Sequence, residues 1–136
     1  MDDLKKTALT RWLAKASNDL TTARTMLTTN PPVTDTACFH AQQCVEKCLK
    51  AFLVFAGIHV ERTHYLPRLV ELCSGFDPGF QEMRGLAVEL TDYAVGDRYP
   101  DDWREIPRDE ATDAVQKAEW AMRFVRRKLN LADAND

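Results

Sequence analysis

Residues 39–58, FHAQQCVEKCLKAFLVFAGI, combine an apolar helical pattern with an unusual number of polar side chains. Its second half is apolar enough for a buried helix, whereas its first half places hydrogen-bonding side chains among the small residues Ala41, Cys44 and Cys48. A helix needs only one polar face for solvent. Here that face includes one His and two Gln, whose side chains offer directed donors and acceptors. The pattern indicates a ligand groove or a subunit interface, and the alternative is a solvated face whose side chains satisfy one another.

Helical spacing sorts these polar side chains into two ridges. One ridge, with steps of three, four and three residues, consists of His40, Gln43, Lys47 and Lys50. The ridge beside it carries Gln42 and Glu46. We therefore take His40, Gln43, Glu46, Lys47 and Lys50 as candidate ligand-binding residues.

Composition limits the class of protein. The chain has 136 residues, of which 45% are hydrophobic and 29% charged, and this predicts one globular domain spanning residues 1–136. The formal net charge of −3 argues against a binder of duplex DNA but leaves room for a local basic patch. The N-terminus has no apolar segment typical of a signal peptide. The longest apolar run, AFLVFAGI, is far shorter than the roughly 20 residues that span a bilayer, so we expect a cytoplasmic protein without membrane contact.

Apolar residues at three- and four-residue steps predict an all-α fold. The expected helices cover residues 4–29, 35–55, 67–73, 78–93 and 109–129. Pro31 and Pro32 end the first, Thr34 or Asp35 caps the second at its start, and Gly57 suits its C-terminal cap. Short connections favour antiparallel neighbours. We expect an up-and-down four-helix bundle with a short extra helix, a core at about 4–129 and a C-terminal tail at 130–136.

Metal ligation receives little support from the sequence. Glu61 and His64 form a Glu-x-x-His pair of the kind that di-iron bundles supply, but such a site needs a second copy. The residue three positions before His40, and likewise before His59, is alanine. The four cysteines contain no Cys-x-x-Cys pair, and we interpret them as buried thiols. We expect neither a metal nor a cofactor.

A second candidate segment is GDRYPDDW, residues 96–103. Asp97, Arg98 and Tyr99 precede a proline that stiffens the chain, and arginine and aromatic side chains suit contacts to phosphate and base. The alternative is an Arg–Asp pair with Tyr99 and Trp103 packed over the end of the bundle. The chain has no glycine-rich phosphate loop and no Gly-x-Ser-x-Gly motif, so the residues alone indicate no enzyme.

Three pieces in order, FHAQQCVEKCLKAFLVFAGI, RTHYLPRLVEL and LTDYAVGDRYPD, resemble the HEPN domain. The resemblance extends to WLAKASNDLTTARTML near the start and DEATDAVQKAEWAMRFV near the end, and so covers nearly the whole chain. It implies a bundle of four or five helices that forms a homodimer. It also implies partnership with a separately encoded minimal nucleotidyltransferase, often as a toxin–antitoxin pair.

Many HEPN proteins are RNases that use an Arg and a His separated by four to six residues, with the active site formed across the dimer. No Arg precedes His40, His59 or His64 at that spacing, and no His follows Arg98. The chain therefore resembles the non-nuclease branch of the family. The residues that match the polar motifs of the family are His40, Gln43, Glu46, Lys47, His64, Arg98 and Tyr99.

Three functions follow as hypotheses. The leading one is a non-enzymatic HEPN binding module, a homodimer that pairs with a minimal nucleotidyltransferase and binds a nucleotide or RNA. The second is an RNase toxin with an atypical site, in which His40 or His64 acts with Arg62 or Arg98. The third is a purely structural dimer whose polar helix faces fix the register of the helices.

Overall fold

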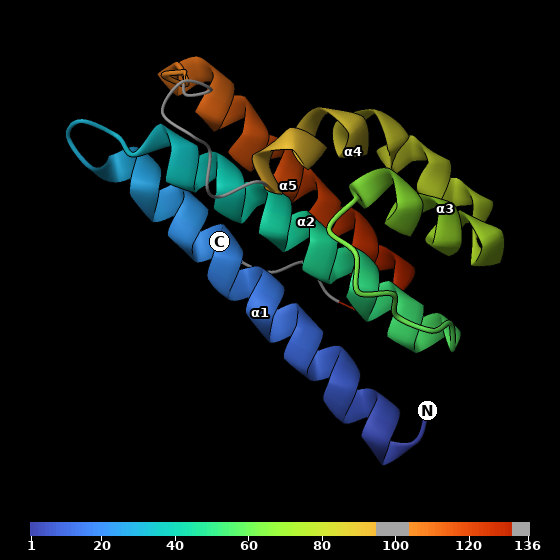
Figure 1. Cartoon of the computed structure of the whole chain (residues 1–136). Helices are drawn as coiled ribbons and strands as arrows, with labels where there is room; N and C mark the ends of the chain where they lie inside the picture. The colour runs from blue at the N-terminus through green and yellow to red at the C-terminus, as the bar shows by residue number, and fades with distance from the viewer. Residues whose placement is uncertain (95–103, 132–136) are drawn as a thin grey trace.

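The computed structural model describes residues 1–94 and 104–131. This part of the chain contains five α-helices, two short 3-10 helices and no strand (Figure 1). In chain order they are α1 (Asp3–Thr28), α2 (Thr34–Ala56), α3 (Leu66–Phe76), η1 (Pro78–Met83), α4 (Arg84–Thr91), η2 (Asp92–Ala94) and α5 (Arg108–Lys128). The all-α class predicted from the sequence is confirmed for the described residues.

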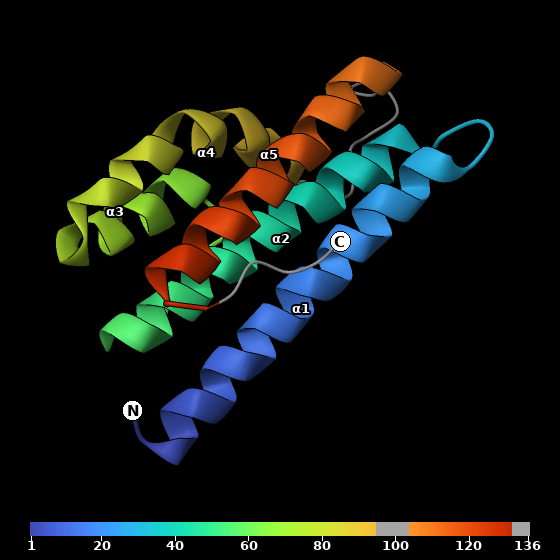
Figure 2. The same cartoon turned by 180° about the vertical axis from the view of Figure 1, so that it is seen from behind.

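Helix α2 lies at the centre of the molecule. It forms an antiparallel hairpin with α1, and α5 lies along another side of α2 and runs in the same direction as α2 (Figures 1 and 2). The shorter helices α3 and α4 fold back on each other and also contact α2. Because α2 touches four other helices, most of its surface is shielded from water. Within the described residues, every helix is too short or too polar to cross a membrane.

Aromatic rings fill the end of the core where α2, α3 and η1 meet. Phe52 is only 1% exposed, and its ring centroid lies 4.3 Å from that of Phe80 and 5.7 Å from that of Phe76. Phe80 continues the contact to Phe124 of α5, with 5.2 Å between ring centroids. Farther along α2, small buried residues such as Ala41 and Cys44 allow the neighbouring helices to approach closely.

The C-terminal boundary of the second helix agrees with the prediction from the sequence, whereas its N-terminal cap does not. The second helix ends at Gly57, whose φ of 73° is the left-handed conformation that glycine adopts readily. Thr34 and Asp35 are not the N-cap of that helix, because the helix begins at Thr34 and Val33 takes the cap position without a side-chain bond.

The region predicted as one helix at residues 78–93 differs from the prediction. It begins as the 3-10 helix η1, where Asp77 accepts a hydrogen bond from the backbone N–H of Gly79 at 2.9 Å. In a 3-10 helix, residues three apart lie above one another, and this spacing turns both Phe80 and Met83 into the core. The α-helical part is limited to α4, and a second 3-10 turn, η2, follows it.

Candidate functional site

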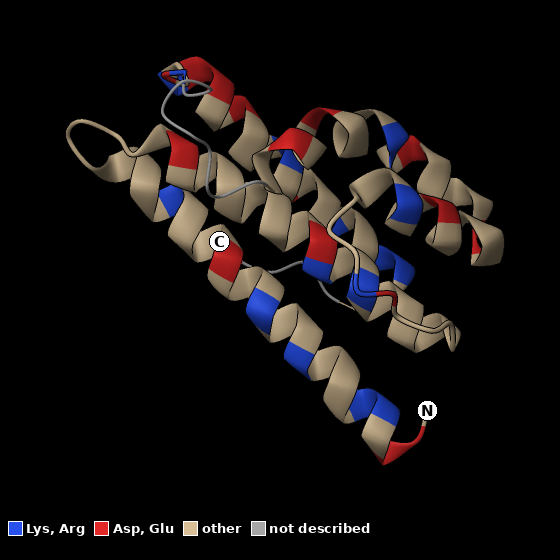
Figure 3. Ribbon diagram, in the orientation of Figure 1, with Lys and Arg blue, Asp and Glu red and all other residues tan. Residues whose placement is uncertain are grey.

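Charged and amide side chains gather where α1 meets α2. The buried polar residues among those described are Asp19, Gln42, Glu46 and Lys50, and each is at most 8% exposed. Figure 3 shows basic residues along α1 and adjoining acidic and basic residues on α2. We use the name charged seam for the set Asp19, His40, Glu46, Lys47, Lys50 and His64.

Asp19 of α1 joins two side chains of α2. Its Oδ1 atom lies 2.8 Å from Nδ1 of His40, and its Oδ2 atom accepts a hydrogen bond from the ammonium group of Lys47. His40 and Lys47 are separated by two helical turns, so they reach the carboxylate from both sides along α2. The side chain of Asp19 is only 10% exposed, and in such a shielded position charge-assisted bonds fix the register of α1 against α2.

Glu46 forms the second half of the charged seam. One of its oxygens accepts a bond from Lys50, one turn later on α2, at 3.1 Å. The other lies 2.7 Å from Nδ1 of His64, in the loop that leads to α3. The Lys50 ammonium also sits 5.6 Å from the centre of the Trp12 ring of α1, at cation–π distance. Each carboxylate of the charged seam is thus paired with one imidazole and one ammonium group.

The two glutamines link the helix to the same loop. Gln42 is fully buried and donates a hydrogen bond from Nε2 to the backbone carbonyl of His64 at 3.0 Å. Gln43 in turn donates from Nε2 to Oε1 of Gln42 at 2.6 Å. The polar character of this core helix therefore has a structural explanation within one chain, because its amide and charged groups satisfy one another.

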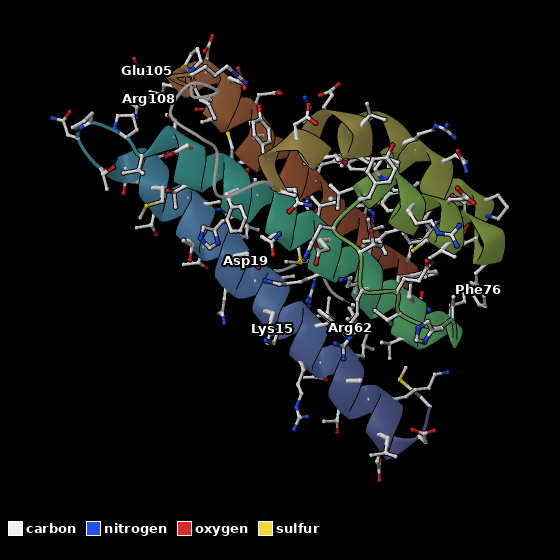
Figure 4. All side chains as sticks on the ribbon, viewed as in Figure 1. Lys15, Asp19, Arg62, Phe76, Glu105 and Arg108 are labelled. Carbon is white, nitrogen blue, oxygen red and sulfur yellow. The ribbon has the colours of Figure 1, made fainter. Side chains whose placement is uncertain are left out.

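Two basic residues beside the charged seam differ from those within it. Lys15 of α1 and Arg62 of the α2–α3 loop are both exposed, and neither forms an ion pair or hydrogen bond within the described part of the chain. Figure 4 shows Lys15, Asp19 and Arg62 along the boundary between α1 and α2. The charged seam and these two residues together contain four Lys and Arg side chains but only two carboxylates. The boundary therefore has an excess of positive charge, on a chain whose formal net charge is −3.

The structure brings most of the predicted site residues together. Of the candidates in the described residues, His40, Glu46, Lys47, Lys50 and His64 all belong to one of the two carboxylate clusters. Gln43 joins through Gln42, and Arg62 lies in the same loop as His64. Asp97, Arg98 and Tyr99 lie outside the described residues.

Asp19 was not among the predicted site residues, although its carboxylate pairs with both His40 and Lys47 of the charged seam. Its signal in the sequence is an acidic residue on the apolar stripe of the first helix, three residues after Ala16 and four before Ala23. Both alanines are fully buried, and a carboxylate at that spacing must find a partner on the facing helix.

A second polar cluster lies where η2 meets the first turn of α5. The Glu110 carboxylate of α5 accepts hydrogen bonds from Arg104 at 3.0 Å and 2.6 Å, and one from the hydroxyl of Tyr93. The Arg104 bonds, followed by the Tyr93 bond, lower the pKa of Glu110. Burial, followed by the Glu110 bond, raises the pKa of Tyr93. This cluster was not predicted from the sequence, because its members come from three different segments, η2, the residues before α5 and α5 itself.

The cysteines offer neither a metal site nor a reactive thiol. All four are free and buried. Burial, and then the nearby Glu110 carboxylate, raise the pKa of the Cys38 thiol to about 11, and burial raises that of Cys73 to about 12. Such thiols stay protonated at neutral pH and are poor nucleophiles. Within residues 1–94 and 104–131, no group of three or more His, Cys, Asp or Glu side chains could hold a metal ion.

Comparison with known proteins identifies the family. A family model described as HEPN domain matches residues 9–128, which include the charged seam and every α-helix except the first turns of α1. The chain belongs to the HEPN family. Membership in this family makes it a module related to nucleotides and RNA. Searches of curated proteins and of solved structures each found no match.

The first prediction concerns the register held by Asp19. Replacing Asp19 with Asn keeps the shape of the side chain but leaves the Lys47 ammonium without its counter-charge. We expect a loss of about 1–3 kcal/mol in the free energy of unfolding, measured by urea denaturation. Asp35→Asn, at an exposed position of α2, serves as the matched control and should change stability by less than about 0.5 kcal/mol. Equal effects of the two substitutions would contradict a structural role for Asp19.

The second prediction concerns pH. Because the pKa of Glu110 is lowered on folding, its contribution to stability is present above its ordinary pKa of 4.5 and disappears as the pH falls through the lower value of the folded state. The stability advantage of the wild type over Glu110→Gln should therefore be constant near neutral pH and shrink below pH 4.5. Chemical denaturation of both proteins, from neutral pH to below pH 4.5, measures this difference in the free energy of unfolding. An advantage that persists unchanged in acid would show that the ion pair is not its source.

Proposed function

We propose that this HEPN domain is a non-enzymatic binding module that holds a phosphate-bearing ligand, a nucleotide or RNA, beside the charged seam. We further propose that it is an up-and-down four-helix bundle that forms a homodimer and pairs with a minimal nucleotidyltransferase. The observation that carries the ligand proposal is the pair of unpartnered, exposed cations, Lys15 and Arg62, next to carboxylates that are already paired. The dimer and the partner protein rest on family membership.

The pairing inside the charged seam supports this function. Asp19 and Glu46 are each bonded to a lysine and a histidine, so neither has a full negative charge left to repel an anion. Arg62 is not restrained by a carboxylate, and its planar guanidinium can bond two phosphate oxygens at once. His64, whose side chain is 69% exposed, is two residues away in the same loop. This arrangement suits a terminal phosphate better than a long duplex.

The third prediction concerns the binding of a phosphate-bearing ligand. Adenosine monophosphate should bind to the wild type, and Arg62→Glu or Lys15→Glu should weaken that binding at least about tenfold, since each replaces attraction for phosphate by repulsion. Isothermal titration at low salt measures the affinity, which should fall as salt is added. Arg84→Glu, at an exposed position on α4, is the control with the same charge change and should leave the affinity nearly unchanged.

An equal loss of affinity in the Arg84 variant would show that only overall charge matters, and the assignment of the site would be wrong. No binding by the wild type of either adenosine monophosphate or short RNA would overturn the ligand proposal. A ligand present at one hundred times its dissociation constant adds about 2.7 kcal/mol to the free energy of unfolding. The melting temperature therefore provides an independent readout of binding.

A structural dimerisation module is the second candidate. The observation that favours it is that the polar groups of α2 are satisfied within one chain, as the bonds of Gln42, Gln43 and Glu46 illustrate. If the domain is only a structural dimerisation module, Glu46→Leu should destabilise it strongly and no ligand should change its melting temperature. The titration with adenosine monophosphate therefore separates it from the binding module.

RNA cleavage is the other activity to be tested, because the imidazole of His64 is exposed. The fourth prediction is that RNA remains intact during prolonged incubation with the pure protein, with and without divalent metal, because the Arg–His spacing of the nuclease branch is absent. Gel electrophoresis of the RNA measures it. Cleavage that is lost in His64→Ala would replace the binding module by an RNase with an atypical site.

A further inference from the structure

His64 has a geometry that ligand binding alone does not require. Its Nδ1 atom lies 2.7 Å from Oε1 of Glu46, and the side chain of that glutamate is only 4% exposed. A carboxylate only accepts hydrogen bonds, so Nδ1 carries the proton and the lone pair of the neutral ring is on Nε2. The His64 side chain is itself 69% exposed, which leaves Nε2 accessible from solvent. The buried carboxylate of Glu46 thus holds the exposed imidazole in the tautomer whose Nε2 atom carries the lone pair.

The backbone of His64 is fixed as well. Its carbonyl accepts the bond from the buried amide of Gln42, and Thr63 Oγ1 accepts a bond from the next backbone N–H, that of Tyr65, at 3.1 Å. His64 is therefore attached to α2 at two points, through its ring to Glu46 and through its carbonyl to Gln42, although it lies in a loop. Fixed orientation lowers the entropy cost of bringing a nucleophile to its target.

The other two histidines lack this combination. His40 is anchored to Asp19, but its side chain is only 27% exposed and lies against Phe39, with 5.2 Å between ring centroids. His59 is exposed in the same loop as His64, yet it has no hydrogen bond or ion pair within the described part of the chain. Only His64 among the three is both anchored by a buried carboxylate and open to solvent.

We propose that His64 is a phosphoryl acceptor, which takes a phosphoryl group onto Nε2 from a small phosphoryl donor. This inference rests on the proposed phosphate site, because the unpartnered Arg62 supplies the charge that would hold the oxygens of the donor. Glu46 acts as a positioning residue that fixes the tautomer and stabilises positive charge on the ring. Lys50, the other partner of Glu46, donates a hydrogen bond to the second oxygen of that carboxylate at 3.1 Å.

The chemistry can be written with phosphoramidate as the donor. The lone pair of Nε2 forms a phosphorus–nitrogen bond to the donor, while the donor's own phosphorus–nitrogen bond breaks. The ammonium group of phosphoramidate leaves as ammonia and takes the electron pair of the broken bond. The ring becomes an imidazolium, whose Nδ1–H remains bonded to the Glu46 carboxylate, and no further reactant is needed.

The test treats the full chain with phosphoramidate at neutral pH and follows the mass of the intact protein and of its peptides over time. We expect one phosphoryl group on His64, attached through Nε2 and lost in acid, to form at least about tenfold faster than on His59. His59 is an internal control, because it is exposed in the same loop of the same molecule. Phosphorus NMR distinguishes attachment at Nε2 from attachment at Nδ1.

Glu46→Gln, checked for folding by circular dichroism, should remove most of the rate advantage of His64 over His59 and mix the two attachment positions. Equal rates at His59 and His64 in the wild type would overturn the proposal, and so would attachment at Nδ1. This failure is distinct from failure of the proposed function, because titration with adenosine monophosphate does not depend on modification of His64.

Discussion

The carboxylates of Asp19 on α1 and Glu46 on α2 are buried, and their pairing determines how the surrounding elements are aligned. Helix α2 packs against four other helices, so its polar side chains cannot rely on water. A buried carboxylate is costly unless it is paired. Asp19 and Glu46 are each paired twice, and these bonds connect α2 to α1 on one side and to the loop before α3 on the other. The hydrophobic contacts stabilise the bundle, and the charged seam fixes how its helices are aligned.

The same pairing determines which groups remain for a partner molecule. Because the inner charges neutralise one another, the positive charge that is left at the boundary belongs to Lys15 and Arg62. The loop that carries Arg62 is held in place by two hydrogen bonds of His64, whose carbonyl accepts from Gln42 and whose Nδ1 donates to Glu46. The proposed phosphate-binding position is therefore attached to the most buried helix of the fold, which would reduce the cost of ordering it if a ligand binds there.

Much of the fold was predictable from the sequence, because helical spacing and turn residues are local signals. The range of the second helix and its end at Gly57 followed from such signals. The 3-10 start of the segment after Asp77 did not, because apolar residues at Phe80 and Met83 fit the spacing of an α-helix equally well. Packing against the core determines which helix type forms there.

The candidate site was predictable only in part. The polar ridge of α2 and the family motifs placed His40, Lys47 and His64 among the candidates, but nothing in one helix tells which residue of another faces it. Asp19 and Trp12 of α1 contact side chains of α2, and Tyr93 of η2 contacts Glu110 of α5, so each of these pairs joins two separate elements. The burial of Glu46 and Lys50 likewise depends on how neighbouring helices cover α2, which the pattern of α2 alone does not specify.

A nuclear magnetic resonance titration of the nitrogen-15-labelled protein with adenosine monophosphate tests the proposed phosphate site residue by residue. We predict that the amide signals of residues 14–16 and 61–65 shift first and saturate together, while those of α4 stay unchanged. Shifts confined to α4 and α5, or no shifts at any ligand concentration, would contradict a phosphate site beside the charged seam.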